Sequence, residues 1–142
     1  MSNTNEGNKG FKLDHTMIRV SDLDKSLDFY ARILGMEVLR NTEYPDGKFT
    51  NVFVGYGPED DFPTIEITYN WEQEEALDKG NSWGHLAIMV PDVVAACDYL
   101  ASEGVTITRP AGPMKNGTRM LAFVEDPDGY KVELNETLSK AS

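Results

Sequence analysis

The chain has 142 residues, enough for one domain with a real hydrophobic core, and a formal net charge of −11 that repels nucleic-acid phosphates and anionic lipid. We therefore expect neither nucleic acid nor a membrane as a partner. The single cysteine, Cys97, excludes an intrachain disulfide, and the N-terminus carries no basic stretch followed by an apolar one, so we expect a cytoplasmic location.

The first predicted elements lie between residues 13 and 69. Residues 1–12 are rich in Ser, Asn and Gly and are expected to form a flexible tail. A strand is predicted up to Val20, and Asp22 then opens a segment with helical periodicity that ends at Gly35, a suitable C-terminal cap. Three further strands, the last at residues 64–69, complete a first strand–helix–three-strand module.

The same order of elements recurs after an acidic stretch at residues 70–82, which we interpret as a solvated linker. The two histidines lie 70 residues apart, and at the same offset Asp92 repeats Asp22 as the start of a helix. Residues 83–138 therefore form a second module. We predict an α+β fold in which two tandem modules make one domain over residues 13–138, with a concave mixed sheet and helices on its outer face.

Four side chains occupy repeated positions on the polar faces of these strands. His15 and His85 open equivalent strands, and Glu66 and Glu133 lie in the last strand of each module. Because strand side chains alternate between two faces, all four can face the concave side of the sheet. A lone strand histidine or glutamate is usually only a surface residue. The repetition favours a site for one divalent metal ion, and the ligand types do not choose among Ni, Co, Zn, Fe and Mn.

Several continuous runs between residues 13 and 136 resemble a known family. They include His15-Thr16-Met17-Ile18-Arg19-Val20, Glu66-Ile67-Thr68-Tyr69-Asn70-Trp71 and the stretch from Ala122 to Glu133. These runs resemble the short bacterial form of the glyoxalase I (lactoylglutathione lyase) family, within the vicinal oxygen chelate superfamily. The resemblance implies a metal-dependent isomerisation of the hemithioacetal of methylglyoxal and glutathione to S-lactoylglutathione, by proton transfer through an enediolate, which detoxifies methylglyoxal.

The resemblance also implies roles for single residues. Glu133 would be the main base, and Glu66 would serve the other face of the substrate. Histidine at position 15 and the shortness of the chain favour Ni(II), with Co(II) or Zn(II) as alternatives. The glutathione contacts would be Arg19, Asn70, Lys115 and Arg119, and arginine suits the two carboxylates of glutathione because it binds a carboxylate through two hydrogen bonds.

Members of this family form homodimers with shared sites. The resemblance therefore implies that His15 and Glu66 of one chain meet His85 and Glu133 of the other, so that a monomer would lack a complete site.

Three other functions were weighed, because a fold does not determine its chemistry. Ring-cleaving dioxygenases use two histidines and one glutamate, so a fourth ligand argues against them. An acyl-CoA epimerase and a non-catalytic metabolite-binding module are the remaining alternatives.

Overall fold

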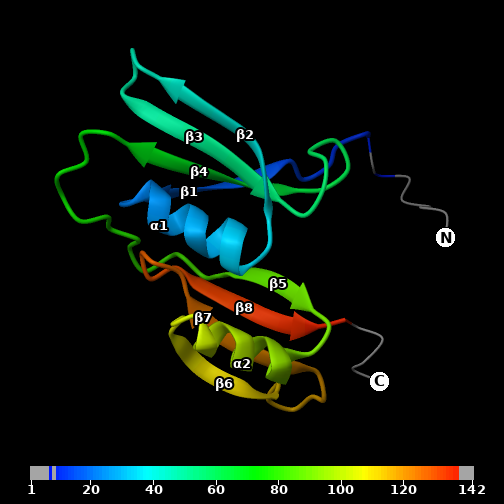
Figure 1. The fold of residues 1–142 in the computed structure, drawn as a ribbon. Helices are drawn as coiled ribbons and strands as arrows, with labels where there is room; N and C mark the ends of the chain where they lie inside the picture. The colour runs from blue at the N-terminus through cyan, green and yellow to red at the C-terminus, as the bar shows by residue number, and fades with distance from the viewer. Residues whose placement is uncertain (1–6, 8, 138–142) are drawn as a thin grey trace.

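The computed structural model describes residue 7 and residues 9–137, which form two modules of the same topology (Figure 1). Each module has one four-stranded mixed sheet, in which the first and last strands of the module are parallel neighbours and the other pairs are antiparallel. The predicted pair of tandem modules is thus confirmed. In spatial order the first sheet holds β1 (His15–Val20), β4 (Thr64–Asn70), β3 (Phe49–Gly55) and β2 (Glu37–Tyr44), and the second holds β5 (Leu86–Val90), β8 (Lys131–Glu136), β7 (Met120–Glu125) and β6 (Ile107–Pro113).

The strands separate a buried face from an open face, as the alternation of side chains predicts. On β1, Ile18 is 2% exposed, whereas Met17 on the other face is 36% exposed. On β5, Ile88 is partly buried against the core and Met89 is exposed. The histidines therefore share their side of each sheet with exposed methionines, away from the helices.

Two helical segments cover the buried faces. Asp22 caps α1 (Leu23–Leu27) and Asp92 caps α2 (Val93–Ser102), each by accepting a 3.0 Å hydrogen bond from the backbone N–H three residues on. Gly35 and Gly104 follow the helical segments with φ of 78° and 82°. This left-handed conformation favours glycine, so the predicted helix ends are confirmed.

The first helical segment differs from the regular α-helix that the sequence predicts. After α1 it continues as a π-helix, η1 (Asp28–Ile33), closed by a hydrogen bond from the Leu34 N–H to the Phe29 carbonyl. The wider turn brings Phe29 and Tyr30, which are neighbours in sequence, into the core together. Beside them, three leucines of the same segment are only partly buried: Leu23, Leu27 and Leu34.

Three tyrosine hydroxyls join the two modules. The Tyr30 hydroxyl donates to Asp126 Oδ2 at 2.7 Å, the Tyr99 hydroxyl of α2 donates to the Ile33 carbonyl at 2.9 Å, and the Tyr130 hydroxyl donates to the Arg19 carbonyl at 2.7 Å. Burial raises the pKa of the Asp126 carboxyl, and the hydrogen bond from Tyr30 opposes that rise. A single hydrophobic core runs through both modules.

Replacing Tyr30 by Phe should destabilise the fold through the contact between modules. Tyr30 is fully buried, and its loss leaves Asp126 Oδ2 without that donor, which costs about 1–3 kcal/mol. Urea unfolding at fixed protein concentration measures the change. Tyr56→Phe is the matched control, because the Tyr56 hydroxyl donates to the Leu34 carbonyl from a side chain that is 53% exposed, and water can replace it. An equal loss of unfolding free energy in Tyr30→Phe and Tyr56→Phe would contradict this account.

A segment without regular secondary structure joins the last strand of the first module to the first strand of the second. No helix or strand lies between the end of β4 at Asn70 and the start of β5 at Leu86, the region of the predicted linker. Residues 1–6 and 8 of the expected tail, and residue 138 at the end of the second module, lie outside the described residues. Within the described part of the chain, no helix is both long and apolar enough to span a membrane.

Candidate functional site

The first predicted ligand pair forms on neighbouring strands of the first sheet. His15 Nε2 lies 2.9 Å from Glu66 Oε1, because β1 and β4 run parallel with Met17 in register with Glu66. The ring of Phe53, which is opposite Glu66 on β3, contacts the imidazole edge to face with ring centroids 5.3 Å apart. The histidine is thus held against the sheet with its nitrogen toward the carboxylate.

The second pair repeats this arrangement more loosely. His85 Nε2 lies 3.4 Å from Glu133 Oε1, and Phe123, opposite Glu133 on β7, contacts the imidazole at 5.1 Å between ring centroids. The sequence places His85 at the start of a strand, whereas it precedes β5 by one residue and does not take part in that ladder. The repeated phenylalanines were visible in the sequence as residues 38 positions after each histidine, but their contact with the rings was not predicted.

A neighbouring carboxylate further distinguishes the first histidine. His15 Nδ1 donates to Asp14 Oδ2 at 2.5 Å, and the Asp14 carbonyl accepts from the Thr64 N–H at 3.0 Å. The corresponding residue before His85 is Gly84, which has no side chain to play this part. A carboxylate on one ring nitrogen sets the tautomer that leaves the other nitrogen free for a metal.

The geometry of both pairs fits a divalent metal ion. With Nδ1 directed at Asp14, His15 Nε2 faces the carboxylate of Glu66, and imidazole nitrogen together with carboxylate oxygen is a ligand combination that divalent metal ions accept. Two ligands about 2.1 Å from one metal are about 3.0 Å apart at a right angle and about 3.4 Å apart at a tetrahedral angle. The observed separations of 2.9 and 3.4 Å match these values.

The two pairs do not meet within one chain. Among the described residues, no three His, Cys, Asp or Glu side chains gather closely enough to hold a metal ion. Each module therefore presents one His–Glu pair on its open face, and we call each pair a candidate half-site.

Both glutamates also use their second oxygen. Glu66 Oε2 accepts from Thr68 Oγ1 at 3.3 Å, and Glu133 Oε2 accepts from Asn135 Nδ2 at 2.6 Å. Strand alternation places residues two apart on the same face, so the sequence contained this signal, although neither partner was predicted to act on a glutamate.

The four predicted glutathione contacts lie in different settings. Arg19 is exposed on the same face of β1 as His15 and lines a cavity of about 170 Å³ with Trp83. Asn70 ends β4 and is half-buried, and Lys115 is exposed in the loop between β6 and β7. Arg119 instead binds its own sheet, because its guanidinium donates to the Glu136 carbonyl at 3.0 Å and to Asn135 Oδ1 at 3.1 Å.

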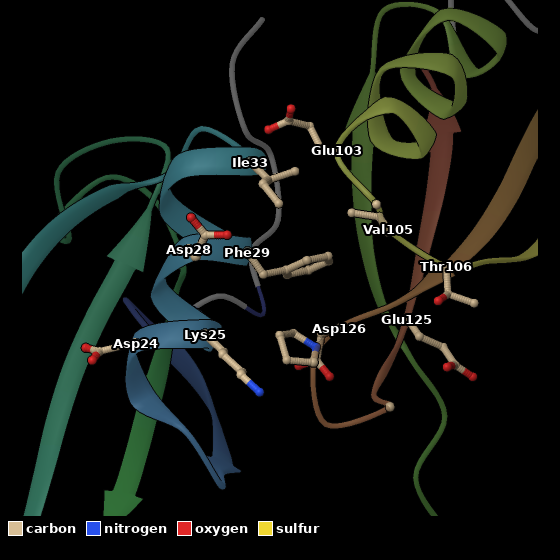
Figure 2. Close-up of a pocket in the computed structure, with 13 residues that line it drawn as sticks. Asp24, Lys25, Asp28, Phe29, Ile33, Glu103, Val105, Thr106, Glu125 and Asp126 are labelled. Carbon is tan, nitrogen blue, oxygen red and sulfur yellow. The ribbon is translucent and has the colours of Figure 1, made fainter.

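One cavity adjoins the second half-site, and a larger one lies away from both half-sites. A cavity of about 460 Å³ lies beside His85 and is lined by three cationic residues, Lys79, Arg109 and Lys131. A larger one, of about 710 Å³, lies between the first helical segment and the turn that follows β7 (Figure 2). That cavity has five carboxylates and contains none of the four predicted ligands, so it is separate from the candidate metal site.

Comparison with known proteins gives consistent results. The model of the Glyoxalase/Bleomycin resistance protein/Dioxygenase superfamily matches residues 12–134. A probable lactoylglutathione lyase of Synechocystis is 55% identical over 126 residues, which cover 89% of this chain and 95% of the relative. The lactoylglutathione lyase of Neisseria meningitidis is 53% identical over 122 residues, covering 86% of this chain and 88% of the relative.

Solved structures agree with these sequence relatives. Glyoxalase I from Zea mays superposes with a TM-score of 0.84 at 40% identity, covering 89% of this chain. The chain spans only 44% of the maize chain. The trypanothione-dependent glyoxalase I of Leishmania major superposes with a TM-score of 0.81 at 39% identity, covering 92% of this chain and 89% of that one.

Proposed function

Because the chain belongs to the Glyoxalase/Bleomycin resistance protein/Dioxygenase superfamily, we propose that it is a glyoxalase I. Its reaction converts the hemithioacetal of methylglyoxal and glutathione to the thioester S-lactoylglutathione. One proton leaves the carbon that bears sulfur, and one proton arrives at the adjacent carbon, so the product is an isomer of the substrate. The observation that carries this proposal is the repeated His–Glu pair on the open face of each sheet.

The complete site would combine two half-sites from two copies of the chain. His15 and Glu66 of one chain would join His85 and Glu133 of the other, which gives the mixed nitrogen and oxygen ligand set that suits a borderline divalent ion. The exposed Met89, which shares its face with His85, supports a covered surface there. A symmetric homodimer holds two such sites.

The glutamates would carry the proton. A bound divalent ion supplies charge stabilisation for the oxygen anion that develops when the carbon-bound proton leaves. Glu133 takes this proton and Glu66 serves the opposite face of the substrate. Each carboxylate has one oxygen toward its histidine, and the second oxygen of Glu133 accepts from Asn135 Nδ2, so Glu133 keeps a defined direction.

Cationic side chains would hold the two carboxylates of glutathione. Arg19 extends from the same strand face as His15, and Lys131 lies two residues before Glu133 in the cavity beside His85. Asn70 and Lys115 would add polar contacts. We place the protein in the cytoplasm, where the glutathione pool keeps thiols reduced.

Metal removal and replacement should test the reaction directly. We expect the chelator-treated protein to lose turnover of methylglyoxal plus glutathione, measured as thioester formation, and to recover it on addition of a single divalent ion. Among Ni, Co, Mn, Fe and Zn, we expect Ni(II) or Co(II) to restore the highest rate.

Three results would contradict parts of this proposal. Highest activity with zinc would contradict the metal preference alone. Metal binding without turnover would keep the ligand set and redirect the search to other thiol adducts and acyl-CoA thioesters. Full turnover of the metal-free protein would contradict the proposed mechanism itself.

A further inference from the structure

Glu133 is held by a chain of hydrogen bonds that is stronger than its counterpart at Glu66. Asn135 Nδ2 donates to Glu133 Oε2 at 2.6 Å, and Arg119 Nη2 donates to Asn135 Oδ1 at 3.1 Å. Arg119 is itself fixed to the end of β8, where its Nε donates to the Glu136 carbonyl at 3.0 Å. The chain therefore runs from a cation bound to the strand backbone, through one amide, to the carboxylate.

The chemistry of the two neighbours fixes the orientation of the Asn135 amide. A guanidinium only donates, so it must face the amide oxygen, and an ionised carboxylate only accepts, so it must face the amide nitrogen. Rotating the amide by half a turn would place donor against donor and acceptor against acceptor. Asn135 is only 8% exposed, so little water competes for these bonds. The amide thus has one stable orientation.

The counterpart in the first module is weaker. Thr68 Oγ1 lies 3.3 Å from Glu66 Oε2 and donates to Asn51 Oδ1 at the shorter distance of 2.9 Å. A hydroxyl carries one proton and cannot donate it to both acceptors at once. Glu66 therefore has only a shared donor where Glu133 has a dedicated one.

We propose that Asn135 and Arg119 are positioning residues for Glu133. Arg119 orients the amide of Asn135, and this amide holds one oxygen of Glu133, so that the other oxygen stays directed at His85 and the metal position. The inference rests on the proposed function of Glu133. It assigns Arg119 a role on its own sheet in place of the contact with glutathione that the sequence predicts.

Kinetics of single and double variants should distinguish these two roles of Arg119. Asn135→Leu keeps the side-chain size and removes the amide, and we expect kcat to fall about 10–100-fold with KM within about twofold. Arg119→Met should lower kcat less, and the double variant should be no worse than Asn135→Leu, because Arg119 acts through Asn135. A rise in KM for Arg119→Met that adds to the loss in Asn135→Leu would show a direct substrate contact and overturn the proposal.

Metal affinity gives a readout that does not depend on turnover. By competition with a chelator, we expect Asn135→Leu to bind Ni(II) about tenfold more weakly than the wild type, with Arg119→Met in between. Arg119→Lys, which keeps a cationic donor, should lie nearer the wild type than Arg119→Met. Thr68→Val is the matched control from the first module and should change the affinity less than about threefold. Equal affinities for the wild type and Asn135→Leu would overturn the proposal.

The same titration separates this proposal from the proposed function. A wild-type protein that binds Ni(II) without turning over the hemithioacetal would overturn the reaction alone, and the order of affinities would still decide the role of Asn135. A wild type that binds no metal would overturn both. Circular dichroism and urea unfolding of each variant establish that the compared proteins are folded.

Discussion

Mixing two inactive variants should restore about a quarter of the wild-type activity. One variant carries His15→Ala with Glu66→Gln and lacks the half-site of the first module, and the other carries His85→Ala with Glu133→Gln and lacks the half-site of the second. Random pairing places the two variants together in about half of the dimers, and each mixed dimer has one intact site out of two. The expectation follows because one chain keeps its two ligand pairs apart.

The measurement is turnover after the two variants are unfolded, mixed and refolded together with metal. Different affinity tags on the two variants allow the mixed dimer to be isolated and assayed by itself. Mixing two differently tagged copies of the same variant is the control and should restore nothing. Isolated mixed dimers without activity would contradict a site shared between chains.

Glu133→Gln should lower kcat about 10²–10⁴-fold, the range attributed to a positioned general base. Glutamine keeps the shape of the side chain and an oxygen that can accept from Asn135 Nδ2, but it does not take up a proton at neutral pH. The fold should persist, because the substitution removes a charge from a part-buried position without leaving a cavity. Steady-state turnover at saturating metal measures the loss.

Glu125→Gln is the matched control for this experiment. Glu125 ends β7 opposite Lys131, one strand away from the ligand pair, and loses the same charge. It should keep turnover within about twofold of the wild type. The turnover of Glu66→Gln should lie between those of Glu125→Gln and Glu133→Gln. Full turnover in Glu133→Gln would show that Glu133 is not the base of the reaction.

Much of the fold could be predicted because its signals are local. Asp22 and Asp92 cap helices through their own side chains, and Gly35 and Gly104 end them through their own backbone conformation. The first helix was less predictable. Its π-helical turn depends on packing Phe29 and Tyr30 against both modules, and no local preference encodes that packing.

The residues of the candidate site were predictable to the extent that they depend on the repeat and on strand alternation. An offset of 70 residues identified His15 with His85, and alternation placed Glu66 and Glu133 on the open faces of their strands. The two alignments of strands, β1 with β4 and β5 with β8, then brought each histidine to its glutamate. The sequence by itself therefore determined which four side chains lie on the open faces, and the pairing of the strands decided which two come together.

Only the tertiary structure decided how these pairs are supported and separated. The bond from His15 to Asp14, and the one from Arg119 to Asn135, depend on side-chain directions that the spacing of residues does not encode. The distance between the two half-sites depends on how one module packs against the other, through contacts such as Tyr30 with Asp126. Alternation is a property of a single strand, whereas the contact of Tyr30 with Asp126 joins residues 96 positions apart, and only the packed chain brings them together.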